Sequence, residues 1–210
     1  MNLLIEQAPK LINKFNEWNR KGPDLYFYKK LMEIRKNKEL EKLIKNTNFI
    51  EIVYATLVSF NMNTRSAKMK YFDEFYENVK NCKDEFVELS EFKLENLSKE
   101  DLEICKNKLS ELFERLDLMS SKAKIVSRLK LMHFLLPELV IPIDRRHTLH
   151  FFYGNMNEFK PEVKFIQIFQ CSWIIATQTN LSIFLDNNWN QTIPKVIDNA
   201  IIAKMSKNEN

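Results

Sequence analysis

Only two glycines occur among the 210 residues of this chain, and this scarcity limits its fold more than any other feature. Tight hairpin turns commonly need glycine, because a residue without Cβ adopts positive φ angles at no steric cost. Apolar residues instead recur at helical spacing along most of the sequence. We therefore predict an all-α fold, a single domain over 1–210, with two helical lobes around a cleft. The lobes are predicted roughly at 48–136 and at 1–47 together with 137–210.

The apolar spacing predicts ten helices, several of which have recognisable ends. Ser98 with Asp101 forms a capping box, Pro137 ends a helix, and Asp144 begins one. Gly154 stands where a C-terminal cap belongs. The helices are predicted at 9–19, 24–37, 39–46, 48–60, 64–81, 99–118, 121–136, 144–153, 160–180 and 194–205.

Composition indicates a packed protein without a membrane span. Apolar residues make up 45% of the chain, and sixteen of them are Phe. The first fifteen residues, with an early acid and a proline, do not resemble a signal peptide, and the longest apolar run is broken by Gln and Asn. We expect a cytoplasmic monomer that uses no cofactor and does not enter a membrane. Reduced, buried thiols are expected at three well-separated positions, Cys82, Cys105 and Cys171.

The net charge of +4 is concentrated in one segment. Residues 119–150 hold six basic and two acidic residues, so this segment alone accounts for the net charge of the whole chain. Residues 84–117, just before it, are strongly acidic. A basic segment of this kind predicts a polyanion such as DNA as a partner, although a solvated helix face is the alternative.

Two polar segments are candidates for contact with DNA. The first is an elbow between apolar helices, where amides could bind base edges and an exposed Met62 could enter a base stack. The second opens the predicted helix 121–136, where free N–H groups favour phosphate and where Lys124 and Arg128 share a wetter face. Ordinary helix caps are the alternative for both. The predicted DNA contacts here are Asn61, Met62, Asn63, Arg65, Ser120, Ser121, Lys122, Lys124 and Arg128.

Three segments in chain order, "LVSFNMN", "MSSKAKIVSRLKLMHF" and "IPIDRRHTLHFFYG", resemble the helix-hairpin-helix DNA glycosylases. This superfamily includes endonuclease III and the 8-oxoguanine glycosylases, and the resemblance covers residues 48–155. It implies a helix-hairpin-helix element that binds DNA and a catalytic aspartate at Asp144. The chain departs from the family in having no G-x-G in the hairpin. The family lysine precedes the aspartate by slightly under twenty residues, whereas Lys130 and Lys124 precede it by 14 and 20. No cysteine cluster follows, so an iron-sulfur version is excluded.

The chemistry of base excision fits this assignment. A carboxylate at Asp144 would stabilise the positive charge that develops at C1′ after the nucleotide flips out of the duplex. The alternative is a helix cap that pairs with Arg145 or Arg146. Lys130, or else Lys124, would form a Schiff base with C1′, unless both lysines simply bind phosphate.

Several other residues complete the predicted site. Arg145, Arg146 and His147 are expected to contact DNA. His147 and His150 form D-x-x-H-x-x-H with Asp144, but the outer two diverge by about 120° on a helix, so no metal is expected. Lys130 and His133 also stand in a "K-x-x-H-x-L-L-P" run that resembles widespread uncharacterised prokaryotic proteins. The predicted base pocket, with ordinary core packing as the alternative, consists of Tyr26, Tyr28, His133 and Trp173.

The function that we predict is that of a DNA glycosylase acting on double-stranded DNA with a damaged or modified base, in repair or in defence against foreign DNA. A non-catalytic helical DNA-binding module is the alternative. A metal-dependent nuclease built on His147 and His150 is a weaker one. These hypotheses differ in whether the Asp144 carboxylate faces an open cleft or only caps a helix.

Overall fold

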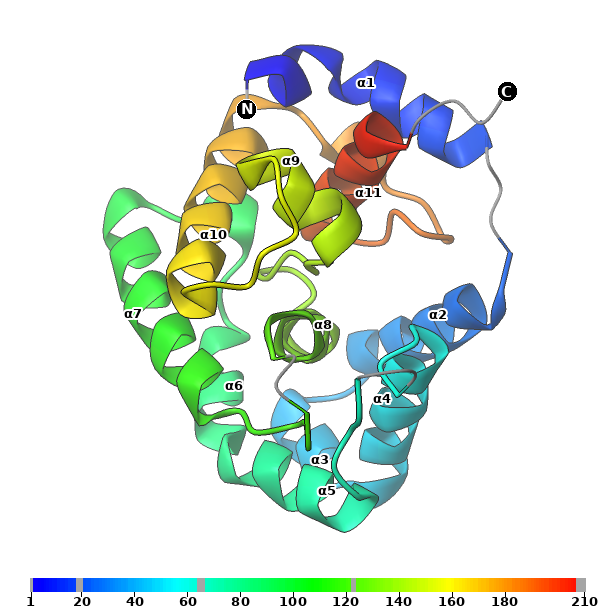
Figure 1. The fold of residues 1–210 in the computed structure, drawn as a ribbon, viewed down its shortest axis with the longest axis vertical. Helices are drawn as coiled ribbons and strands as arrows, with labels where there is room; N and C mark the ends of the chain where they lie inside the picture. Colours follow the sequence, from blue (N-terminus) through cyan, green and yellow to red (C-terminus); the bar gives the residue numbers. More distant parts are fainter. Residues whose placement is uncertain (1, 18–20, 64–66, 122–123, 207–210) are drawn as a thin grey trace.

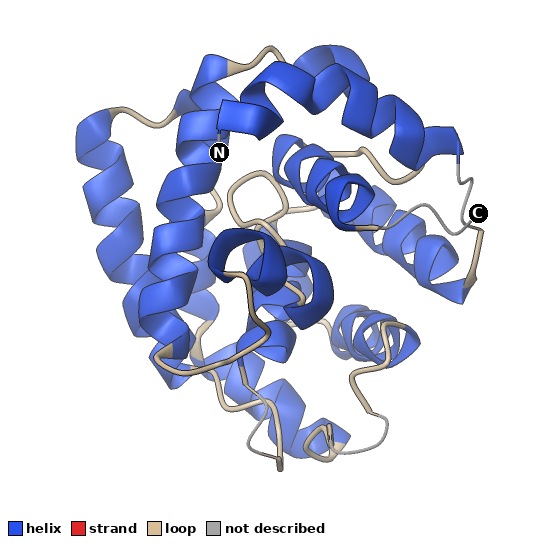
Figure 2. Cartoon of the chain, turned by 45° about the horizontal axis from the view of Figure 1, so that its top comes forward, coloured by secondary structure: helices blue, strands red, loops and turns tan. Residues whose placement is uncertain are grey.

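The computed structural model describes residues 2–17, 21–63, 67–121 and 124–206, and the regular elements in these ranges are helical (Figures 1 and 2). The predicted all-α class is confirmed. The α-helices are α1 (Asn2–Glu17), α2 (Pro23–Lys36), α3 (Leu40–Ile44), α4 (Thr47–Ser59), α5 (Phe72–Asn81), α6 (Lys83–Leu89), α7 (Lys99–Arg115), α8 (Ile125–Leu135), α9 (His150–Tyr153), α10 (Pro161–Gln178) and α11 (Ile193–Met205). Short 3-10 turns are η1 (Leu94–Asn96) and η3 (Ser182–Phe184), and η2 (Arg145–Leu149) is a π-helical turn.

Helix α8 lies at the centre of the fold and is surrounded by the other helices (Figure 1). Ile125, Leu129, Met132 and Leu136 recur at helical spacing, and all four are buried. So are Arg128, His133 and most of the other side chains of the helix. A helix that is covered on every side must bury its polar residues together with its apolar ones.

The remaining helices pack around α8 in pairs. Helix α1 packs against α11, so the first and last helices of the described chain are neighbours, α10 packs against α7, and α2 packs against α4. None of the helices in the described ranges has both the length and the apolarity that crossing a membrane requires. The three cysteines are free thiols, with Cys82 and Cys105 buried and Cys171 half-buried.

Local end signals are confirmed at three helices. Ser98 and Asp101 form the reciprocal capping box of α7. Asp144 is the N-cap of η2, and Gly154 caps α9 with a φ of 67°, in the left-handed region. These signals depend only on contacts within a few residues, which is why the sequence reveals them.

The helix predicted at 64–81 is too long. Residues 64–66 lie outside the described ranges, and the chain from Ala67 to Tyr71 is not helical. Met69 forms an antiparallel bridge with Met119 instead, and Ser120 N–H donates to Lys68 O at 2.9 Å. This pairing satisfies backbone groups that the prediction assigned to a helix. The short helix α6 was not predicted.

Candidate functional site

A cleft of about 1410 Å³ opens between the helices that surround α8. Its walls come from α1, α2, α8 and α11, from the end of α4, and from the segment that leads into η2 and α9. All three histidines of the chain, His133, His147 and His150, line it. Aromatic rings form much of the apolar wall, namely Phe15, Tyr28, Phe60, Phe134 and Trp189.

Asp144 faces this cleft from the start of a π-helical turn. The turn is closed by Leu149 N–H donating to Asp144 O at 3.0 Å, five residues apart. Asp144 Oδ1 accepts from His147 N–H at 2.6 Å, and Oδ2 lies 2.9 Å from His147 Nδ1. Isolated π turns are uncommon and often occur at functional sites. The Asp144 side chain is 30% exposed, so it caps the turn and still reaches the cleft.

The partner of Asp144 is His147 and not an adjacent arginine. Burial acts to raise the pKa of Asp144, but the hydrogen bonds from His147 and the nearby positive charge of Lys130 outweigh burial and lower this pKa. Arg145 Nε instead lies 3.3 Å from Glu158 Oε1 and donates to Met156 O at 3.2 Å. The sequence alternative of a cap paired with Arg145 is therefore wrong.

Lys130 faces the cleft from α8. Its Nζ donates to Phe60 O at 3.4 Å and lies 4.6 Å from the centre of the Phe60 ring. Burial lowers the pKa of Lys130 to about 8, and the negative charges of Asp144 and Asp198 only partly oppose this effect. Burial therefore makes the neutral form of this amine, which is its nucleophilic form, far more populated than in an ordinary lysine.

A smaller cleft of about 330 Å³ adjoins the first. It is lined on its far side by Met62, Met119 and Val126. Lys130, Asp144, Arg146 and His147 line both clefts. We call these four residues the shared wall. The structure thus brings together four of the predicted site residues at the place where two cavities meet.

Helix α11 contributes a buried ion pair that the sequence analysis missed. Lys195 Nζ lies 2.5 Å from Asp198 Oδ2, and both residues line the larger cleft while being almost fully buried. Burial raises the pKa of Asp198 in spite of the adjacent lysine. Two opposite charges three residues apart in the apolar run "IPKVIDNAIIA" were a signal for such a pair.

The four predicted base-pocket residues separate into two groups. Tyr28 and His133 line the larger cleft and are joined by a hydrogen bond of 3.3 Å between Tyr28 Oη and His133 Nε2. Tyr26 is 62% exposed and Trp173 donates its Nε1–H to Leu97 O, and both lie outside the two clefts. Position within a helix could not separate these aromatic residues, because the cleft depends on which helices face each other.

The predicted elbow lies at the end of α4. Asn61 lines the larger cleft and has a φ of 62°, a left-handed conformation that asparagine tolerates better than most residues. Asn63 accepts a hydrogen bond from Met69 N–H at 3.2 Å. Met62 is half-buried against the core, so the expectation of an exposed apolar wedge is wrong. Arg65 lies outside the described residues.

The residues predicted to contact phosphate at the start of α8 do not share one exposed face. Helix α8 begins at Ile125, so Ser120 and Ser121 do not stand at its start, and Ser121 Oγ accepts from Lys68 N–H at 3.3 Å. Arg128 is 4% exposed, with its guanidinium 4.7 Å from the centre of the Phe113 ring, so the expected wetter face is wrong. The covered position of α8 explains this burial.

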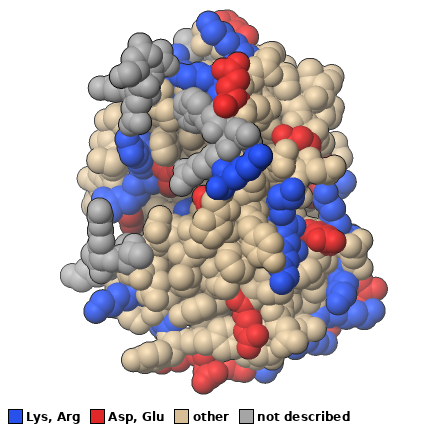
Figure 3. Space-filling model, turned by 90° about the vertical axis from the view of Figure 1, so that its right-hand side faces the viewer, with Lys and Arg blue, Asp and Glu red and all other residues tan. Residues whose placement is uncertain are grey.

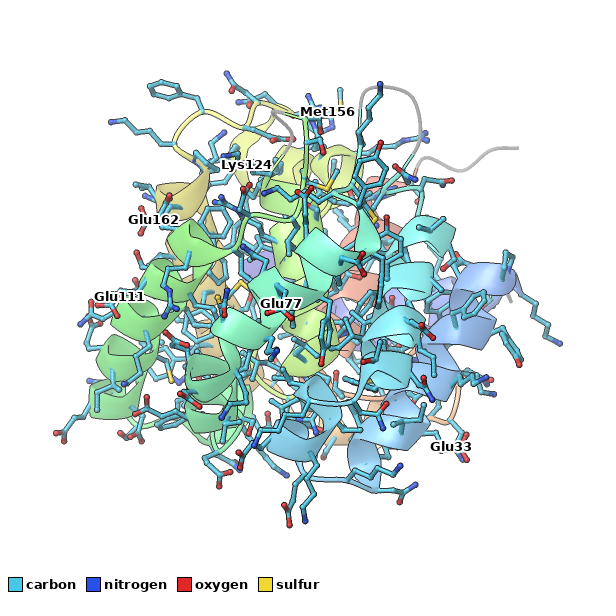
Figure 4. All side chains as sticks on the ribbon, turned by 90° about the horizontal axis from the view of Figure 1, so that it is seen from below. Glu33, Glu77, Glu111, Lys124, Met156 and Glu162 are labelled. Carbon is cyan, nitrogen blue, oxygen red and sulfur yellow. The ribbon has the colours of Figure 1, made fainter. Side chains whose placement is uncertain are left out.

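The exposed cations of the basic segment are Lys124, Arg145 and Arg146, while Lys122 lies outside the described residues. Figure 4 shows Lys124 toward the edge of the molecule where Met156 also lies. On the face shown in Figure 3, Lys and Arg are scattered among Asp and Glu. The cations of residues 119–150 are thus divided between the surface and the interior.

Within the described ranges, no group of three or more His, Cys, Asp or Glu side chains is arranged to hold a metal ion. The chain matches no protein-family model, no curated protein and no solved structure.

Proposed function

We propose that this chain is a DNA glycosylase that removes a damaged or modified base from double-stranded DNA by hydrolysis of the N-glycosidic bond. The observation that carries the proposal is the shared wall, where Asp144 and Lys130 line the same two clefts. Excision of a flipped nucleotide needs negative charge beside C1′. The lowered pKa of Asp144 supports an ionised carboxylate for that role.

The size and lining of the larger cleft also support the proposal. A flipped base needs apolar or aromatic surface on which to stack, and Phe60, which is half-buried and whose ring centre lies 4.6 Å from Lys130 Nζ, offers such surface in the larger cleft. Ligand pockets in proteins are typically about 300–1000 Å³, so a cleft of about 1410 Å³ leaves room for a nucleotide together with adjoining backbone.

On this proposal, the lobe of residues 48–136 and the lobe of 1–47 with 137–210 meet at the clefts, and the packing of α2 on α4 and of α10 on α7 joins the two lobes. Residues 119–134 would then take the place of the hairpin and its following helix. Phosphates would contact Lys124, Arg145 and Arg146, which are exposed, and Asn61 would reach the bases from the elbow. The enzyme would act as a cytoplasmic monomer without a cofactor. A neutral Lys130 would add cleavage of the abasic strand through a Schiff base.

A non-catalytic DNA-binding module is the second candidate. The bond from His147 N–H to Asp144 Oδ1 favours it, because a carboxylate with only a structural role would make the same capping bond.

Incubation with duplexes that carry a panel of damaged or modified bases, followed by alkali to cleave abasic sites, tests the proposal. We expect strand breaks at one class of lesion with the wild type and none with Asp144→Asn. Binding to every duplex without release of any base would instead favour the binding module.

A further inference from the structure

The His147 imidazole contacts the Asp144 carboxylate, and both residues line the two clefts. Its Nδ1 is 2.9 Å from Asp144 Oδ2, its side chain is 22% exposed, and it lines both clefts. The same carboxylate holds its backbone N–H at 2.6 Å. The backbone and the imidazole of His147 are therefore each held by one oxygen of the same carboxylate, and Nε2 lies on the ring edge opposite Nδ1.

The chemistry of this contact determines the tautomer of His147. The pKa of Asp144 is lowered, so its carboxylate has no proton to donate at neutral pH. Nδ1 must then be the donor, and the neutral imidazole carries its lone pair on Nε2. Among the described residues, Nε2 of His147 has no hydrogen-bond partner, and it is not a buried unsatisfied atom. It is thus an accessible base.

Neither of the other two histidines of the larger cleft combines a contact to a carboxylate with an accessible ring nitrogen. Both ring nitrogens of His133 are occupied, Nδ1 by Val140 O at 2.7 Å and Nε2 by Tyr28 Oη at 3.3 Å. Burial and the nearby charge of Lys195 lower the pKa of His133 to about 3. His150 is exposed and makes no hydrogen bond with a carboxylate among the described residues. His147 is the histidine that a carboxylate orients.

We propose that His147 is the general base of the reaction, held in its reactive tautomer by Asp144, and this inference rests on the proposed glycosylase function. A water oxygen forms a bond to C1′ while the bond from C1′ to the base nitrogen breaks, and its electron pair stays on the departing base. One water proton moves to His147 Nε2. The departing base takes up a proton from solvent, and the imidazolium later returns its own proton to solvent. The Asp144 carboxylate stabilises the imidazolium while it exists.

The electrostatic surroundings of His147 come from several elements. Arg146 and His150 flank it on its own segment, Lys130 faces both clefts from α8, and the Lys195–Asp198 pair faces the larger cleft from α11. Asp24 from α2 and Lys14 and Glu17 from α1 complete the charged lining of the larger cleft. The pH dependence of the excision rate reflects all of these groups. The test therefore compares the pH–rate profiles of wild type and variants with one another.

Two substitutions separate catalysis from positioning. His147→Asn retains a donor close to Nδ1 but has no base at Nε2, whereas His147→Gln places an amide near Nε2 and loses the donor to Asp144. We expect both variants to lower single-turnover excision by about 100-fold or more. The acid limb of the wild-type pH–rate profile should be absent from the residual activity of both variants. His150→Asn should retain this limb. A His147→Asn variant with the wild-type rate and limb would overturn the proposal, because His147 would then only position Asp144.

The tautomer can be measured without any substrate. The ¹⁵N chemical shifts of the imidazoles should show His147 protonated on Nδ1 and not on Nε2 in the neutral wild type, with the proton moved to Nε2 in Asp144→Asn. Protonation on Nε2 in the wild type would overturn the proposal whatever the substrate. If the expected tautomer is present but no duplex in the panel loses a base, the glycosylase function fails, and the proposal for His147 as its base fails with it.

Discussion

Tyr28 on α2 and His133 on α8, 105 residues apart in the chain, are joined by a hydrogen bond in the wall of the larger cleft. Val140 O accepts from His133 Nδ1–H, so Nε2 carries the lone pair and Tyr28 Oη donates to it. The rings are also nearly parallel, with 5.9 Å between their centres. This contact fixes α2 to the central helix beside the candidate site.

Tyr28→Phe should destabilise the fold, because it leaves the buried Nε2 of His133 without a donor. The loss expected for such an unsatisfied buried group is about 1–3 kcal/mol in the free energy of unfolding. Urea denaturation of the wild type and the variant measures it. Tyr26→Phe is the matched control, since Tyr26 is 62% exposed and should change stability by no more than about 0.5 kcal/mol. Equal effects of the two substitutions would contradict the buried hydrogen bond.

Asp144→Asn should abolish base release while the protein remains folded. Asn can still accept from His147 N–H, so the free energy of unfolding should change by less than about 1 kcal/mol. Loss of the negative charge beside C1′ should lower single-turnover excision by about 100- to 1000-fold. DNA affinity should be unchanged or slightly higher, because one negative charge is removed. Asp73→Asn, at an exposed acid in the first turn of α5, is the charge-matched control and should retain activity.

Lys130 should make the free energy of unfolding depend on pH in the alkaline range. Its folded pKa of about 8 lies below its ordinary value of 10.5, so between these values the unfolded chain binds more protons than the folded chain. The free energy of unfolding contributed by Lys130 therefore rises with pH across this window and is lower below it. Lys130→Met should remove this rise, as seen in the difference between denaturation curves of variant and wild type. Lys204→Met, at an exposed lysine of α11, should keep it. If the free energy of unfolding of Lys130→Met rose with pH as much as that of the wild type, Lys130 would not be the source of the rise.

DNA binding should distinguish Arg146 from Arg128. Arg146 is exposed at the shared wall, and its replacement by Ala should lower the slope of log affinity against log salt concentration by about one. Arg128 is buried against Phe113, so Arg128→Met should leave that slope unchanged. Lys38→Ala, at an exposed position outside both clefts, is the surface control. A lower slope for Arg128→Met together with an unchanged slope for Arg146→Ala would instead support Arg128 as the phosphate contact, as the sequence predicted.

The sequence by itself determined most of the helices and several of their ends, because these depend on neighbours within about one turn. The spacing of Ile125, Leu129 and Met132 identified a buried stripe on α8, and Asp144 was recognisable as an N-cap. The same local pattern contained the D-x-x-H spacing that places His147 against Asp144. Its interpretation as a metal triad or a DNA contact missed that hydrogen bond.

Only the tertiary structure decided which side chains are covered and which face one another. Arg128 looked solvated in a sequence that shows one apolar stripe, but α8 is enclosed on all sides and the guanidinium is buried. Lys195 and Asp198 on α11, Tyr28 on α2 and Lys130 on α8 reach one cleft because helices distant in sequence pack around α8. The burial of a side chain, and the pKa shift that burial causes, depend on all of its long-range contacts. A periodic pattern within one helix does not show which other helices make those contacts.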